Sequence, residues 1–153
     1  MISRRLVPLA ATALIVALGV SGCASNSEYC KTAKAHESIL QDFGSTRTDK
    51  AYGGYLKTAK ALAKVAPKEI SPQWEAVRDS LHDVIETQGA TNPKLAIEDM
   101  NDYSKVNGLS SKQMKALNAA YTAFNNTAKD RKKIVADFVE RCDLDLSPTA
   151  GKD

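Results

Sequence analysis

The 153-residue sequence has little of what catalysis usually requires. It holds two histidines, His36 and His82, and it lacks a phosphate-cradling glycine loop, a Gly-x-Ser-x-Gly turn and any pairing of a nucleophile with a base. These absences argue against an enzyme. We therefore expect no catalytic residue and no cofactor.

Metal ligands are also sparse, and neither of two candidate groups has the pattern of a known site. His82 and Glu86 stand four positions apart on one helix face, but a site needs three or more ligands. The second group consists of oxygen ligands at Glu98, Asp99, Asn101 and Asp102. It lacks the glycine and the spacing of a calcium loop. No metal site is predicted.

Neither sign of charge dominates the chain, which carries 21 Lys and Arg against 18 Asp and Glu. Two of the arginines, Arg4 and Arg5, lie in an N-terminal segment that we expect to be removed, which leaves 19 basic residues. A near-neutral domain gives no reason to expect nucleic acid as a partner. We interpret the basic run Arg131-Lys132-Lys133 as a solvated helix face.

The longest apolar run stands at the N-terminus, where two arginines precede residues 6–20. The run is shorter than the roughly 20 residues of a stable membrane span. It is followed by the small residues Ser21 and Gly22, as in a signal peptide. The pattern predicts a signal peptide over residues 1–22.

The four residues Val20-Ser21-Gly22-Cys23 resemble the bacterial lipobox, in which an apolar residue and two small ones precede a cysteine. The resemblance implies that Cys23 is diacylated on sulfur and becomes the N-terminus after cleavage. Two or more acyl chains give stable membrane attachment. Residues 23–27 would then be the acylated cysteine and a short stalk, and the protein would be anchored on the extracytoplasmic face of the cell membrane. An ordinary signal peptide with a chance cysteine is the alternative.

The two remaining cysteines, Cys30 and Cys142, form an even pair in an oxidising compartment, which favours a disulfide. The bridge would close almost the whole folded region and contribute roughly 4–5 kcal/mol in the chain-entropy model. Two buried free thiols are the alternative. A redox-active pair is disfavoured, because such cysteines usually stand close together in sequence.

Helix-forming residues dominate, and no run of alternating β-branched residues predicts a strand. Start and stop signals predict five helices, over 28–44, 48–66, 72–88, 93–106 and 111–142. Ser27 should cap the first and Gly44 should end it, while Ser71 should cap the third with Pro72 in its first position. Continuity of the last helix through Asn125-Asn126 is left open, because asparagine is a mediocre interior residue.

Residues 28–146 are expected to form one domain, followed by a frayed tail over 147–153. The residues expected in its core share one face of each helix. They are Tyr29, Cys30, Ala33, Leu40, Phe43, Tyr52, Tyr55, Leu56, Ala59, Leu62, Ala63, Trp74, Val77, Leu81, Val84, Ile85, Gln88, Leu95, Ala96, Met100, Tyr103, Met114, Leu117, Tyr121, Phe124, Ala128, Val135, Phe138 and Cys142. Arg131 interrupts the last stripe.

The expected disulfide constrains the topology. Cys30 near the start and Cys142 near the end share one end of an up-down bundle only if the number of full traverses is even. The shortest predicted helix, 93–106, would be roughly 20 Å long and need not traverse. The prediction is an all-α, up-down four-helix bundle closed by one disulfide, with this short extra helix folded back on residues 111–124.

Taken whole, the chain resembles the small helical lipoproteins of actinobacteria. The features that carry the resemblance are the lipobox at Cys23, Tyr29-Cys30, Ala66-Pro67, Trp74 and Cys142. The resemblance implies a cell-surface lipoprotein and supplies no catalytic residues.

The function expected from these features is a non-enzymatic, membrane-tethered binding or scaffolding domain. The alternative is a carrier of a small apolar ligand, which would need an internal cavity of several hundred cubic ångströms. Partner binding should concentrate in the connections 44–48 and 89–110, at the end away from the lipid. The candidate partner surface is Glu98, Asp99, Asp102 and Lys105, which should face outward. A purely structural cap is the alternative for this region.

Overall fold

The computed structural model describes residues 27–146, and no strand occurs in that range. The predicted signal peptide, the lipobox cysteine Cys23 and the predicted tail lie outside the described residues. The elements are α1 (Glu28–Ala35), α2 (Glu37–Gln41), α3 (Asp49–Val65), α4 (Ser71–Gly89), the 3-10 helix η2 (Ile97–Asn101), α5 (Tyr103–Val106), α6 (Ser111–Asn126) and α7 (Ala128–Cys142). The all-α prediction is confirmed for this part of the chain.

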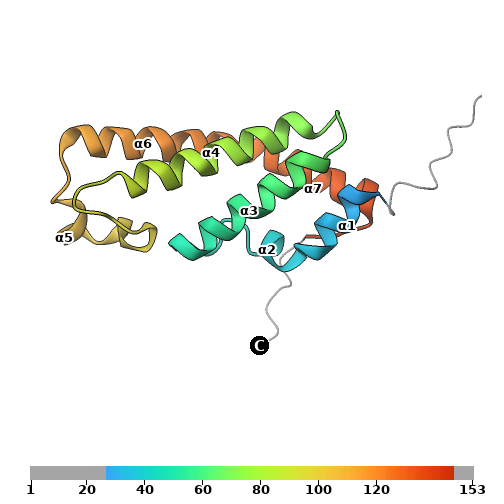
Figure 1. Cartoon of the computed structure of the whole chain (residues 1–153), viewed down its shortest axis with the longest axis horizontal. Coiled ribbons are helices and arrows are strands. Elements are labelled where there is room, and N and C mark those ends of the chain that lie inside the picture. Colours follow the sequence, from blue (N-terminus) through green and yellow to red (C-terminus); the bar gives the residue numbers. More distant parts are fainter. Residues whose placement is uncertain (1–26, 147–153) are drawn as a thin grey trace, which may run out of the picture.

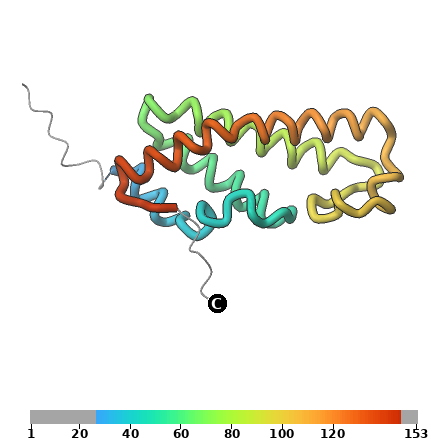
Figure 2. Tube along the Cα trace, turned by 180° about the vertical axis from the view of Figure 1, so that it is seen from behind, coloured from blue at the N-terminus to red at the C-terminus, as the bar shows by residue number. Residues whose placement is uncertain are grey.

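The molecule is elongated, with α4 lying alongside α6 and α7 (Figure 1). The helix α1 lies at one end of these long helices, η2 and α5 lie at the other end, and α3 runs beside α4 between them (Figures 1 and 2). The predicted disulfide joins Cys30 of α1 to Cys142 of α7, with their Cα atoms 5.1 Å apart. The disulfide and the segment carrying η2 and α5 therefore occupy opposite ends of the long axis.

Side-chain caps explain where several helices begin. The Ser27 hydroxyl accepts a hydrogen bond from the amide of Cys30, as predicted, and Thr48 does the same for Ala51. Ser110 and Gln113 form a reciprocal capping box at the start of α6. Gly44 has a φ of +82°, a conformation that favours glycine, and follows the first helical region as predicted.

Two helix predictions need correction here, and one open question is answered. The first helical region is divided at His36, whose φ of −111° departs from helical geometry. Ser71 is the first residue of α4, and its hydroxyl donates to Glu75 instead of capping the helix. The continuity of the last region, which the sequence left open, is also decided: the region is two helices, with Thr127 between them and its hydroxyl donating to the carbonyl of Phe124.

The predicted helix over 93–106 is replaced by an irregular stretch, η2 and α5. Its backbone donors find partners outside a helix: the amide of Leu95 donates to the Thr91 hydroxyl, and the amide of Ile97 donates to the Asp49 carboxylate. These contacts satisfy backbone amides that would otherwise be paired within a helix. The segment therefore does not form the helix that the sequence pattern predicts.

Most of the predicted core is buried, including Tyr29, Tyr52, Trp74, Leu81, Leu117 and Phe138. Three expectations are wrong: Tyr103 is 79% exposed, Val135 is 40% exposed, and Ala128 is exposed as well. Ile134 is buried in place of Val135, so the buried residues of α7 follow a spacing of four, through Phe138 to Cys142. Because the helix is broken at Thr127, the spacing of buried residues in α6 does not predict which residues of α7 are buried.

An aromatic junction closes the core next to the disulfide. The indole Nε1 of Trp74 on α4 donates to the hydroxyl of Tyr29 on α1, at 3.0 Å. The ring of Phe138 on α7 lies 5.3 Å from the Tyr29 ring and 5.8 Å from the Trp74 ring, centroid to centroid. Burial raises the pKa of Tyr29 well above its ordinary value, so the phenol stays neutral. Three helices thus meet at one hydrogen-bonded cluster.

Candidate functional site

The distal segment, residues 90–110, lies at the end of the molecule opposite the disulfide (Figures 1 and 2). Asp49 at the start of α3 holds it twice: its carboxylate accepts from the amide of Ile97 at 2.9 Å, and its own amide donates to the Glu98 carboxylate at 2.9 Å. The second contact satisfies one of the free amides at the start of α3, where a negative charge is favourable. The start of α3 and the distal segment are therefore neighbours.

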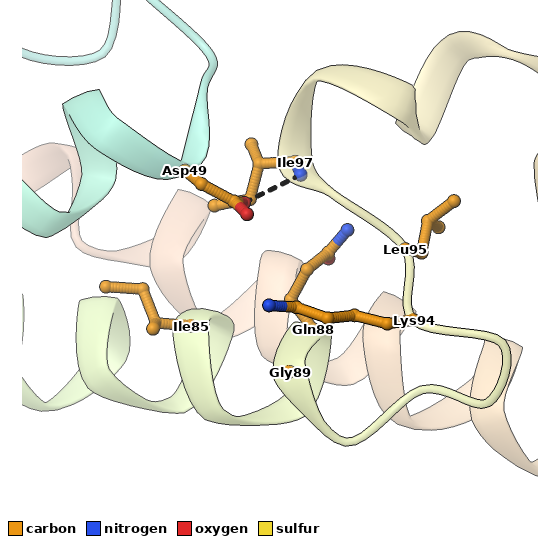
Figure 3. Close-up of a pocket in the computed structure, with 7 residues that line it drawn as sticks. All are labelled: Asp49, Ile85, Gln88, Gly89, Lys94, Leu95 and Ile97. Atoms are coloured by element: carbon orange, nitrogen blue, oxygen red, sulfur yellow. Dashed lines mark hydrogen bonds between the residues drawn. The ribbon is translucent and has the colours of Figure 1, made fainter.

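Gln88 supplies a second attachment for the distal segment. Its side chain is 3% exposed and donates to the carbonyl of Ala96 at 3.0 Å. A cavity of about 170 Å³ lies beside it, with Ile85 and Gly89 of α4 on one side and Leu95 and Ile97 on the other (Figure 3). Figure 3 also shows the Asp49–Ile97 hydrogen bond and the Lys94 side chain along the same cavity. The distal segment is thus fixed to both α3 and α4.

The four residues predicted as a partner surface do come together on this segment, but each also makes a contact within the protein. Glu98 bonds the amide of Asp49, and Asp99 pairs with Lys105 at 2.6 Å. Asp102 caps α5 by accepting from the amide and the hydroxyl of Ser104. The Ser104 hydroxyl lowers the pKa of Asp102, and Asp99 raises the pKa of Lys105. Replacing all four together would therefore remove contacts that shape the segment.

Tyr103 is the functional candidate that the sequence pattern assigned wrongly. It is the first residue of α5 and is 79% exposed, whereas a continuous helix would have placed it in the core. Tyrosine is enriched among the residues that dominate binding energy at protein interfaces, because it offers both a large apolar face and a hydroxyl. An exposed tyrosine between Asp102 and Ser104, on a fixed segment, is suited to partner contact.

The prediction that Arg131, Lys132 and Lys133 form a solvated face is wrong for Arg131, which is half-buried. Lys132 and Lys133 are exposed as expected. The Arg131 guanidinium lies over the Phe124 ring, 4.7 Å from the centroid, and its Nη1 donates to the carbonyl of Phe124 at 2.9 Å. It lines a cavity of about 270 Å³ between the α2–α3 connection and α6. A charged residue that interrupts an apolar stripe was the sequence feature that pointed to this position.

The candidate metal ligands gather on α4 without forming a buried site. His82 Nδ1 lies 3.6 Å from a Glu86 oxygen, and Asp83 brings a third ligand atom within 4.8 Å of the others. All three residues are exposed. The three side chains therefore lie together on an exposed face of α4.

One apolar cavity within the core is small. A cavity of about 40 Å³ lies among apolar side chains that include Leu40, Trp74, Ile134 and Phe138. Sites for small molecules usually measure roughly 300–1,000 Å³. This cavity could hold a group the size of a methyl, so it offers no room for an apolar ligand.

Comparisons with known proteins return no match: no family model, no curated protein and no solved structure is significantly similar to the chain.

Within residues 27–146, no helix has both the length and the apolar character needed to cross a bilayer.

Proposed function

We propose that the protein is a non-enzymatic, lipid-anchored binding protein of the extracytoplasmic membrane face, and that its distal segment contacts a protein partner. The observation that carries the proposal is Tyr103, an exposed aromatic residue on a segment fixed by Asp49 and Gln88. A preorganised segment loses little conformational freedom on binding, which favours affinity.

The anchor is the residue Cys23, which the lipobox-like sequence supports. Residues 23–27 span at most about 18 Å when fully extended, so the start of α1 stays close to the lipid surface. The disulfide is at this end, and α4, with 19 residues and a length of about 28 Å, leads away from it. The distal segment is then held away from the membrane, where a partner can reach it.

The up-down bundle is part of the same proposal. It is supported by the order of packing, in which α1 contacts α3, α3 contacts α4, and α4 contacts both α6 and α7. The contact of α7 with α1 closes the circle. Carriage of a small apolar ligand within the bundle stays the alternative, and it has less support because the cavity beside Leu40, Trp74 and Phe138 measures about 40 Å³.

Replacing Cys23 by serine should abolish incorporation of a fatty-acid label into the protein, because the thiol that accepts the diacylglyceryl group is gone. Metabolic labelling of cells that express either form measures this. The double variant Cys30→Ala/Cys142→Ala is the control and should still be labelled. Equal labelling of the Cys23→Ser variant and the parent would refute the anchor.

Replacing Tyr103 by alanine should weaken partner capture by roughly 30-fold, the loss expected for an interface residue worth about 2 kcal/mol. Its free energy of unfolding should change by less than about 0.5 kcal/mol, because the side chain is 79% exposed. Crosslinking on intact cells, scored on the same captured protein, measures the effect.

Val139→Ala is the matched control for Tyr103, because Val139 is 51% exposed and stands on α7, three residues before Cys142. Capture should be unchanged by this substitution. If the Tyr103→Ala variant captures the partner as well as the parent does, the distal segment is not the binding surface.

A further inference from the structure

A polar cavity of about 270 Å³ has no residue of the distal segment in its lining, and both of its charged lining residues are arginines. It is bounded by the α2–α3 connection, α3, α6 and the first turn of α7. The residues that matter for its chemistry are Arg47, Tyr52, Tyr121, Phe124, Asn125 and Arg131. Two guanidinium groups with no carboxylate in the lining make this cavity electropositive.

The Arg131 guanidinium is held in one orientation. The Phe124 ring supports its face, and its Nη1 donates to the carbonyl of Phe124 and to the hydroxyl of Thr127. Within residues 27–146, its Nε and Nη2 donate to no protein group. Burial lowers the pKa of Arg131, so the site bears the unfavourable free energy of a half-buried cation.

Capping of α6 accounts for the position of the Arg131 Nη1 group. It does not account for the Nε–Nη2 edge of the guanidinium, which has no partner among residues 27–146. The Nη1 group satisfies the Phe124 carbonyl near the end of α6, a structural role that any donor of the right length could fill. The Nε–Nη2 edge of a guanidinium is a fork that matches the two oxygens of a carboxylate or phosphate. Arg47, which has no ion pair or hydrogen bond to residues 27–146, lines the same cavity.

The phenol of Tyr52 adds a neutral donor, whereas the phenol of Tyr121 donates to the side-chain amide oxygen of Gln88 at 3.4 Å. Burial raises the pKa of both, that of Tyr121 to about 12, while the positive charge of Arg47 acts in the opposite direction on each. The nearby acidic groups are Asp49, whose carboxylate bonds Ile97, and Asp130, which precedes Arg131 in sequence. At neutral pH the cavity therefore offers donors and positive charge to a ligand.

We propose that this cavity binds the carboxylate or phosphate group of a small anionic ligand, held by the free edge of Arg131 and by Arg47. The volume of about 270 Å³ is at the lower limit for small-molecule sites, so it accepts a compact ligand or the acidic end of a larger one. The inference concerns a site separate from the distal segment and holds whether or not a protein binds there.

Amide NMR titration of the purified mature protein tests the proposal, with phenyl phosphate and benzoate as probes and benzamide as the neutral counterpart. We expect saturable shifts around Asn125 and Arg131 with at least one anion at millimolar concentration, and none with benzamide. Glycerophosphoglycerol, a water-soluble form of a phospholipid headgroup, distinguishes the sources: tighter binding of it than of phenyl phosphate assigns the site to a lipid headgroup, and the reverse order assigns it to a soluble anion.

Arg47→Gln should weaken anion binding at least tenfold without unfolding the protein, because Arg47 makes no hydrogen bond within the described residues. Lys57→Gln removes the same charge from an exposed position of α3 and should leave binding within twofold of the parent. Arg131→Lys keeps the charge, loses the fork and should also weaken binding. The proposal is overturned if no anion gives saturable shifts, or if Arg47→Gln and Lys57→Gln weaken binding equally.

Discussion

We expect the double replacement of Cys30 and Cys142 by alanine to lower the free energy of unfolding by roughly 5 kcal/mol. The chain-entropy model gives this value for a closed loop of about 112 residues. The bridge constrains nearly the whole folded region in the unfolded state. It also ties α1 to α7, and both cysteines are fully buried. Alanine avoids placing an unpaired hydroxyl in the core, which serine would do.

Urea unfolding of the parent and the double variant, followed by circular dichroism, measures the disulfide's contribution. The parent protein treated with a reductant is the matched control, since it loses the bridge without any change of sequence, and it should be destabilised in the same direction. A loss below about 1 kcal/mol in both cases would mean that α1 is held by packing alone and that the cross-link adds little.

Replacing Trp74 by alanine should cost about 3–5 kcal/mol of stability, as for other large aromatic side chains removed from a core. Trp74 is 2% exposed and joins α4 to α1 and α7 through its contacts with Tyr29 and Phe138. Its loss removes the ring packing and the indole hydrogen bond together. Urea unfolding midpoints, with an unchanged slope, measure the effect.

Tyr29→Phe separates the hydrogen bond from the packing at the same junction. It removes one hydroxyl and leaves the buried Nε1 of Trp74 without its partner, so it should cost about 1–3 kcal/mol. Combined with Trp74→Phe, which removes the donor as well, it should cost less than the sum of the two single changes. Strict additivity would show that the hydrogen bond contributes nothing.

The sequence predicted those parts of the fold that local signals determine. The third predicted helix, 72–88, differs from α4 by one residue at each end, and so does the second, 48–66, from α3. Thr48 caps α3 and Pro67 follows it, so both ends are marked by local chemistry. The disulfide followed from cysteine parity and the expected compartment.

The distal segment could not be predicted in the same way, because its backbone is shaped by residues far away in sequence. Asp49 and Gln88 bond Ile97 and Ala96, and these contacts replace the helical hydrogen bonds that the local pattern favours. Because the segment is not a continuous helix, the helical spacing between Leu95 and Tyr103 does not predict which way the Tyr103 side chain points. The candidate partner residue was therefore assigned to the core.

The environment of Arg131 escaped prediction for a similar reason. Its burial depends on the break at Thr127 and on the α2–α3 connection, which brings Arg47 to the same cavity. An arginine next to two lysines resembles a solvated face when charge alone is considered. Its position within an apolar stripe was the more informative feature, because a charge there requires either a packing partner or a ligand.

The most direct test of a tethered protein that binds through its distal segment is site-specific photocrosslinking on intact cells. A photoreactive phenylalanine analogue is placed at Tyr103 in one variant and at Val139, near the disulfide, in another; both positions are exposed. We predict that the analogue at 103 forms a defined adduct with a second protein and that the analogue at 139 does not form it. The same adduct from both positions, from 139 alone or from neither would contradict the account.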